Sequence, residues 1–208
     1  MRPADTGPAD VSGGRPHDDL SVLVRILPPG SASRRARAVI REALQGAGVR
    51  EPAIGDAEIV VAELAANCER HARQPYELRV LSLGDVPIWC EIVDADPDLG
   101  EVSRVLDVLR LKVGPALGAR DGDDGEAVGL QEAEGVVYAR AEGLDLFAES
   151  GRGLLLAYQL SDGRCRAYPT RTIITGAPAK AVAFALPTRS GEDLPLPHLV
   201  DASFSCGS

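Results

Sequence analysis

The sequence predicts an α+β fold, a two-layer sandwich in which helices cover one face of a mixed or antiparallel sheet. Segments with strand-like and helix-like apolar spacing follow one another as strand, helix, helix, strand, strand, loop, helix, strand, strand. Hydrophobic residues make up 45% of the chain, which is enough for a buried core. Because only 4% of the residues are aromatic, that core must consist mostly of Ala, Val, Leu and Ile.

The first half of the chain begins with an apolar run at 20–27 that is typical of a strand and is followed by Pro-Pro-Gly. Ser33 is placed to cap a helix that runs to about Leu44, where two nearby glycines end it. Asp56 is placed to cap a second helix that runs to about Ala72. Both helices carry an apolar stripe at helical spacing, so each is expected to pack on the sheet.

The second half is less regular. Its expected elements are strands at 77–83 and 88–93, an amphipathic stretch at 102–113, a helix at 153–160, and strands at 164–168 and 181–186. An acidic, Gly-rich run at 121–126 is typical of a mobile loop. The predicted organisation is therefore a flexible arm at 1–19, one domain at 20–187 with a long insert at 97–150, and a polar tail at 188–208.

Charge and cysteine content limit the classes of function. The net charge is −9, so a nucleic-acid backbone is a poor partner, although Arg34, Arg35 and Arg37 form a local basic patch. The four cysteines show no metal-binding spacing and are expected to be reduced thiols. The start of the chain does not resemble a signal peptide, and no apolar run reaches the ~18–20 residues of a membrane span. We therefore expect a cytoplasmic protein that does not enter a membrane.

Polar residues of the second predicted helix form the first candidate site. Glu63, Asn67 and His71 are four residues apart, so they share one edge of that helix, beside its apolar stripe. A carboxylate and an amide there would lie at the border of the core. The spacing alone fits equally a solvated polar edge on which Glu63 pairs with Arg70 or Arg73.

Two further features have both functional and structural interpretations. Asp94 ends a strand, where its carboxylate could accept a hydrogen bond from a ligand amine, or could simply begin the turn before Pro97. Gly151 and Gly153 precede an apolar helix. They could let backbone N–H groups approach an anion, or could give only a flexible start to that helix.

Taken together and in this order, these segments resemble the nucleotide-binding boxes of the GHKL superfamily. Residues 59–72, IVVAELAANCERHA, resemble its N box, most closely that of the anti-sigma-factor serine/threonine kinases of actinobacterial type. Residues 91–94 resemble the first half of the G1 box, residues 151–154 the G2 box, and residues 179–184 the final strand. The resemblance covers roughly residues 20–187 and implies a Bergerat-type ATP-binding fold.

The resemblance implies a role for each matching residue. Asn67 would hold Mg²⁺ bridging the ATP phosphates, and Glu63 would act as the catalytic general base. Asp94 would bind the adenine amino group. The remaining residues implied in ATP binding are Arg70, His71, Gly151, Arg152, Gly153 and Leu154.

The sequence also departs from the family pattern. The G1 box normally contains two glycines after its Asp, whereas this chain has Asp96 and Asp98 at those positions. Ala181 stands where the final strand usually has the Thr that supports adenine recognition. The predicted lid within 97–150 is long and acidic. Extra acids near the phosphates would repel ATP unless Mg²⁺ or Arg152 offsets them.

The implied function is an ATP–Mg-binding regulator that phosphorylates an anti-anti-sigma partner of the STAS class or sequesters a sigma factor. The alternative is a non-catalytic regulator that binds a protein partner and has a degenerate nucleotide site. The family commonly dimerises through its sheet or first helix, but the sequence does not decide whether this chain forms a homodimer.

Overall fold

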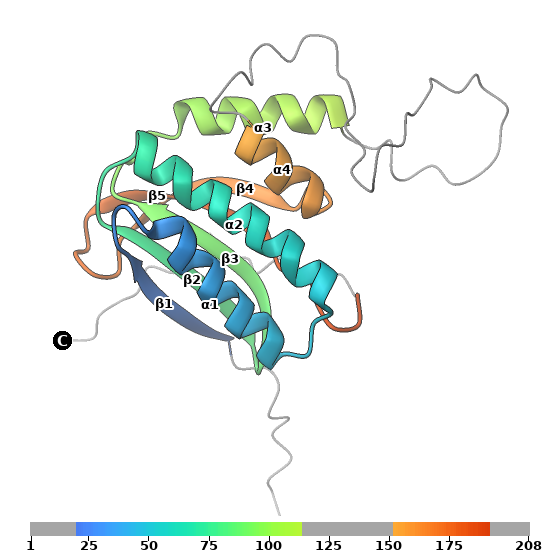
Figure 1. The fold of residues 1–208 in the computed structure, drawn as a ribbon. Coiled ribbons are helices and arrows are strands. Elements are labelled where there is room, and N and C mark those ends of the chain that lie inside the picture. Colours follow the sequence, from blue (N-terminus) through green and yellow to red (C-terminus); the bar gives the residue numbers. More distant parts are fainter. Residues whose placement is uncertain (1–19, 114–151, 192–208) are drawn as a thin grey trace, which may run out of the picture.

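A single sheet with helices on one face forms the domain (Figure 1). The computed structural model describes residues 20–113 and 152–191. In chain order its elements are β1 (Leu20–Leu27), α1 (Ala32–Gly46), α2 (Glu51–His71), β2 (Tyr76–Leu83), β3 (Val86–Asp94), α3 (Gly100–Val113), α4 (Arg152–Leu160), β4 (Cys165–Arg171) and β5 (Pro178–Ala185). This arrangement confirms the predicted α+β two-layer class.

The five strands lie in the order β1-β2-β3-β5-β4, and each neighbouring pair is antiparallel. At one end of the sheet the register aligns Leu27, Tyr76, Asp94 and Lys180 on four adjacent strands. Side chains of directly paired residues point to the same face. Asp94 and Lys180 are therefore neighbours on the face that the helices cover.

The helix starts differ from those predicted. Helix α2 begins at Glu51 with a Pro in its first turn, so Asp56 lies inside the helix and does not cap it. The reason is that Pro is favourable at the first helical positions, where its missing N–H needs no partner. Helix α1 begins at Ala32, and Ser33 is not its cap; its hydroxyl donates to the carbonyl of Ala62 on α2 at 2.9 Å. That bond ties the two helices together.

The main core lies between the sheet and the helices. Leu78, Val80, Ile92 and Phe184 point from the central strands toward the helices and are at most 1% exposed. Val60, Val61 and Leu64 of α2 are buried against them, with exposures of at most 2%. Burying one such side chain stabilises the fold by about 1.5–3 kcal/mol. This packing fixes the position of the polar edge of α2.

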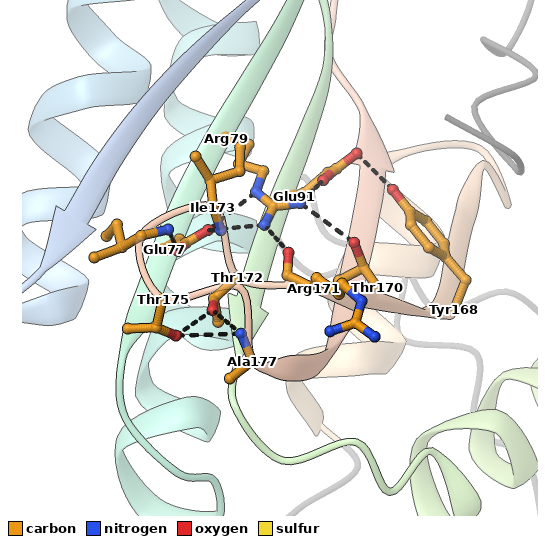
Figure 2. A network of polar contacts seen from close by, with 11 residues as sticks. Glu77, Arg79, Glu91, Tyr168, Thr170, Arg171, Thr172, Ile173, Thr175 and Ala177 are labelled. Carbon is orange, nitrogen blue, oxygen red and sulfur yellow. Dashed lines mark hydrogen bonds and ion pairs between the residues drawn. The ribbon is translucent and has the colours of Figure 1, made fainter. Parts of the chain in front are cut away.

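The opposite face of the sheet carries a buried charged network centred on Arg79 (Figure 2). Arg79 donates to Glu77 Oε2 at 2.8 Å and lies 3.5 Å from Glu91 Oε2. Tyr168 of β4 donates its hydroxyl hydrogen to the other oxygen of Glu91. We call these four residues the Arg79 cluster.

The Arg79 cluster also holds the loop between β4 and β5. Both oxygens of Glu77 accept backbone N–H groups, from Ile173 and Ile174, each at 3.0 Å. Arg79 also donates to the backbone carbonyl of Arg171 at 2.6 Å. A carboxylate and a guanidinium from the centre of the sheet thus fix the path of this loop, as Figure 2 shows.

Candidate functional site

Helix α2 carries the first three predicted site residues, and two of them, Asn67 and His71, line a pocket, whereas Glu63 is not among its lining residues. Glu63 and Asn67 are half-buried and His71, in the last turn, is exposed. Their four-residue spacing places them on one edge, as predicted. The neighbouring residues Leu64 and Cys68 are buried and anchor this edge to the core.

The start of α4 packs directly on this edge. A Cβ atom added to Gly153 would lie 2.9 Å from Asn67 Nδ2 and 3.1 Å from Glu63 Cβ. A side chain at position 153 would force Asn67 or Glu63 to shift, so the close approach of α4 to α2 favours glycine there. The predicted glycine motif and the predicted polar edge therefore meet in space.

Arg70 is bonded within its own helix. Its guanidinium donates to Asn67 Oδ1 at 3.2 Å and to the carbonyl of Ala66 at 3.2 Å, rather than to Glu63. An amide oxygen has two acceptor sites, and among the described residues only Arg70 donates to Asn67 Oδ1, which leaves one site for a ligand. The bond also places a positive charge beside the residue predicted to face Mg²⁺ and phosphate.

A pocket of about 90 Å³ opens between α2, α3, α4 and the sheet. Its polar lining comes from Asn67, Cys68, His71, Asp94, Glu101 and Lys180. Its apolar lining comes from Leu64, Ala72, Val102, Val105, Leu154 and Val182. Four predicted site residues, Asn67, His71, Asp94 and Leu154, thus line one cavity.

Asp94 lies at the end of β3 and is only 1% exposed. Its Oδ1 accepts hydrogen bonds from Lys180 Nζ at 2.9 Å and from the Asp96 backbone N–H at 3.0 Å. Its Oδ2 accepts a weak bond from the Cys68 thiol at 3.6 Å. Burial raises the pKa of Asp94, and the bond from Lys180 opposes that rise.

Lys180 is the site residue that the sequence reasoning missed. It lies on β5 opposite Asp94, is 8% exposed, and also donates to the backbone carbonyl of Asp96 at 3.1 Å. Ala181, which stands where the resembled family has a Thr, packs with Val93 on the other face of the sheet. Strand alternation explains the different placement of Lys180 and Ala181, because successive residues of a strand face opposite sides.

The extra acids after β3 have a structural role. Asp94, Asp96 and Asp98 each accept the backbone N–H two residues ahead, at 3.0, 3.3 and 2.8 Å. Such Asx turns bend the chain without glycine. The bond from Asp98 lowers the pKa of Asp96, and Lys180 lies 3.6 Å from its Oδ2. Lys180 therefore offsets part of the negative charge of Asp94 and Asp96.

Cys68 is a residue of α2 that contacts Asp94 and lines the pocket. Burial and the nearby Asp94 carboxylate raise its pKa, so the thiol stays protonated and donates to Asp94. Among the described residues, Cys68 is a buried cysteine that forms no disulfide. The expectation of reduced thiols agrees with the free cysteines 68, 90 and 165.

Part of the predicted insert lines the pocket. Helix α3 contributes Glu101, Val102 and Val105 to its wall. Gly151 and the rest of the predicted lid, 114–150, lie outside the described residues, as does the side chain of Arg152. The acidic run at 121–126 is likewise outside them.

The donor set fits Mg²⁺ only in a limited way. Across 20–113 and 152–191, no group of three or more His, Cys, Asp or Glu side chains could enclose a metal ion. Mg²⁺ usually binds through one or two protein oxygens, waters and substrate phosphates, rather than in an all-protein cage. The free acceptor site of Asn67 Oδ1 at the pocket rim fits that mode.

Comparisons with known proteins do not assign the chain to a family. No protein-family model matches it, and no curated protein matches it. Among the helices of the described residues, none is both long and apolar enough to cross a bilayer.

Proposed function

We propose that this chain binds ATP with Mg²⁺ in the pocket between α2, α3, α4 and the sheet. The observation that carries the proposal is the meeting of Asn67, Asp94 and Leu154 around one cavity, with Gly153 packed against Asn67. These residues come from three distant parts of the sequence, so a merely solvated helix edge does not account for their convergence.

The pocket has two chemically different ends. Its deep end holds the buried Asp94 and Lys180, where a base could form hydrogen bonds away from water. Its rim holds Asn67 and His71, and the start of α4 lies beside it. The positive end of a helix and exposed N–H groups favour an anion such as phosphate. The volume of about 90 Å³ is below the ≈ 300–1,000 Å³ of pockets that enclose whole ligands, so this pocket would enclose only part of a nucleotide.

The residues at the rim can support phosphoryl transfer. Bound ATP and Mg²⁺ would supply the transferable phosphoryl group and neutralise its charge. Glu63 is half-buried beside Gly153 and would accept the proton of an attacking hydroxyl or water. Arg70 and His71 would contribute donors and positive charge on the phosphate side. We propose a partner-directed serine/threonine kinase of the anti-sigma type, acting on a STAS-type protein or sequestering a sigma factor.

A specific observation favours the alternative, a partner-binding regulator without catalysis. Asp94, the proposed base anchor, is already paired with Lys180 and hydrogen-bonded to Cys68 and Asp96. If those bonds satisfied Asp94 completely, the pocket would be a structural polar cluster and the helix layer would serve only to bind a protein.

A calorimetric titration with ATP and ADP in the presence of Mg²⁺ tests the proposal. We expect wild-type binding that depends on Mg²⁺, and loss of the Mg²⁺-dependent part in Asn67→Ala. Gln45→Ala removes an exposed amide from α1 and should bind like wild type. Absence of binding by the wild-type protein at millimolar nucleotide would leave only the partner-binding alternative.

A second experiment separates binding from turnover. Glu63→Gln should bind ATP like wild type but transfer no phosphate to a candidate STAS-type partner, measured by mass increase of that partner. Transfer at the wild-type rate by Glu63→Gln would remove Glu63 from the role of general base.

A further inference from the structure

Strand β1 is an edge strand whose outer side is open to a further strand. It lies at one end of the strand order and, within the described sheet, pairs with β2 alone. Its eight residues, LSVLVRIL, include one charged residue and no Pro, and their register with β2 has no shift. Edge strands are usually protected by Pro, by several charges or by a bulge. The other edge strand, β4, has Pro169, Arg166 and Arg171.

One hydrogen bond shows which backbone groups of β1 point outward. Arg25 donates Nη1–H to the Val24 carbonyl at 3.0 Å in an exposed bond, so this carbonyl faces away from β2. In a strand the N–H and C=O groups of one residue point to the same edge, and those of residues two positions away do likewise. Val22, Val24 and Ile26 therefore offer backbone donors and acceptors to an incoming strand.

An apolar stripe follows the same residues. Alternate residues of β1 share one face of the sheet, and we call them the β1 stripe: Leu20, Val22, Val24 and Ile26. Ile26 is paired in register with Glu77, so the stripe lies on the face of the Arg79 cluster, away from the helices. Leu20, Val22 and Ile26 are all exposed. An incoming strand would cover part of this stripe.

Two more exposed side chains lie next to the end of the β1 stripe. Glu77, the register partner of Ile26, accepts the backbone N–H groups of Ile173 and Ile174, each at 3.0 Å (Figure 2). Ile173 is 54% exposed and Ile174 is 46% exposed. A buried carboxylate thus fixes two isoleucines at the surface near Ile26. Fixed apolar side chains beside an open strand edge are typical of a surface that binds another protein.

The same part of the chain is basic, although the whole chain has a net charge of −9. Residues 20–41 contain no Asp or Glu and five arginines: Arg25, Arg34, Arg35, Arg37 and Arg41. Arg25 alternates with the β1 stripe and so lies on the helix side of the sheet, where α1 packs on β1 (Figure 1). An incoming strand therefore meets apolar side chains on one face and positive charge on the other.

This charge distribution selects the kind of partner. A second copy of the chain, adding its own β1 by two-fold symmetry, would bring the arginines of both copies together. Like charges that face each other oppose association. A strand in which apolar residues alternate with Asp or Glu is complementary to both faces. A nucleic acid would match the arginines but not the β1 stripe.

We infer that the outer edge of β1 is a docking site for an extended acidic segment of a different protein, which adds a sixth strand to the sheet. The backbone of that segment bonds to Val22, Val24 and Ile26. Its apolar side chains pack on the β1 stripe, and its carboxylates pair with Arg25 and the arginines of α1. An incoming N–H group takes over the Val24 carbonyl and releases Arg25 for this pairing. The described lining of the pocket includes no β1 residue, so the inference does not depend on nucleotide binding.

Fluorescence anisotropy with synthetic peptides tests the inference without altering the protein. The probe is a fluorescein-labelled peptide of sequence EVEIEVEI, and we expect it to bind the wild-type protein. The peptide KVKIKVKI keeps the apolar residues and reverses the charges, so it should bind at least about tenfold more weakly. Two further versions carry N-methyl groups on every Glu or on every apolar residue. One should lose binding and the other keep it, because neighbouring N–H groups point to opposite edges of a strand.

Substitutions on β1 provide the second test. Val24→Pro removes an outward N–H and should weaken the acidic peptide by about tenfold or more, since Pro is tolerated on the open side of an edge strand. Ile26→Ser shortens the β1 stripe and should also weaken binding. Leu111→Ser removes an exposed apolar side chain of α3 and should bind like wild type. Circular dichroism and thermal unfolding check that each variant is folded.

Three results would overturn the inference. The first is no binding of the acidic peptide by the wild-type protein at millimolar concentration. The second is equal binding of the acidic and basic peptides, or equal binding of the two N-methylated versions. The third is a wild-type dimer in analytical ultracentrifugation that Val24→Pro dissociates, which would assign the edge of β1 to a second copy of the chain. Each of these results leaves the proposed ATP binding standing, because that binding is measured separately.

Discussion

Two buried charged clusters lie on opposite faces of the same sheet, and they differ in whether they border the pocket described above. The Arg79 cluster faces away from the helices, and Arg79 and both its carboxylate partners are less than 8% exposed. The Asp94–Lys180 pair faces the helices and is equally buried. Burial alone therefore does not distinguish a structural polar cluster from a candidate binding site.

Their position relative to the pocket distinguishes them. Glu77 accepts hydrogen bonds from Arg79 and from two backbone N–H groups, and Glu91 accepts one from Tyr168 and forms an ion pair with Arg79. A satisfied network of this kind stabilises one conformation. Asp94 and Lys180 are also paired with each other, and Lys180 further contacts Asp96, but both residues border a cavity. We therefore expect the first cluster to contribute stability, whereas the second lies where the proposed ligand would bind.

The largest expected effect is the loss of stability in Arg79→Met. This change leaves Glu77 and Glu91 buried without their cation, which costs about 3–5 kcal/mol in comparable sites. Urea denaturation measures it. Arg110→Ala breaks an exposed ion pair with Asp107 and should change the free energy of unfolding by less than about 1 kcal/mol. If the two variants unfold at the same urea concentration, the Arg79 cluster does not have the structural role assigned to it.

Gly153→Ala should have the next largest effect, at the contact between α4 and α2. The new methyl group would overlap Asn67 and Glu63, and such overpacking costs about 1–3 kcal/mol. Gly55→Ala is a matched control, because a Cβ at that helical position meets nothing within 4 Å. The control should be neutral or stabilising by up to about 1 kcal/mol. Equal thermal midpoints would show that α4 does not approach α2 this closely.

A pH-dependent effect is expected from Glu91. Burial raises its pKa above the ordinary value of 4.5, although Tyr168 and Arg79 oppose the shift. The folded state then binds this proton more tightly than the unfolded chain. Protonation of Glu91 therefore stabilises the folded state relative to the unfolded chain, and this stabilisation falls as the pH rises from 4.5 through the folded pKa. Glu91→Gln removes the titration, so the stability of wild type relative to the variant should decrease across that window in denaturant titrations. A difference that does not vary with pH would contradict the raised pKa.

The smallest expected effect concerns the thiols and compares the pocket with the core. Burial raises the pKa of Cys68 and Cys90, and raises that of Cys165 to about 12. All three should resist alkylation by iodoacetamide at pH 8, because the thiolate is the reactive form. Mass spectrometry of the digested protein measures labelling at each site, and urea should expose all three. Rapid labelling of Cys68 in the native protein would mean that the pocket admits solvent more freely than the core does.

Much of the fold was accessible to local reasoning. The strand and helix periods of residues 20–94 predicted the order of elements, and the α+β class is confirmed. The start of α2 was placed too late, at Asp56, because a favourable capping residue competed with an earlier Pro. The spacing of Glu63, Asn67 and His71 correctly placed them on one edge, since helical geometry is set by neighbours in sequence.

The sequence by itself determined the fold class, the polar edge of α2 and the presence of a glycine in the first turn of α4. Only the tertiary structure decided that this glycine lies against Asn67 and that Lys180, not Ala181, faces Asp94. In β5 the residues on both faces of the sheet are buried, so an apolar–polar alternation does not mark which face is which. The face is set by pairing with β3, a contact between segments far apart in the chain, and such long-range register is not written in local periodicity.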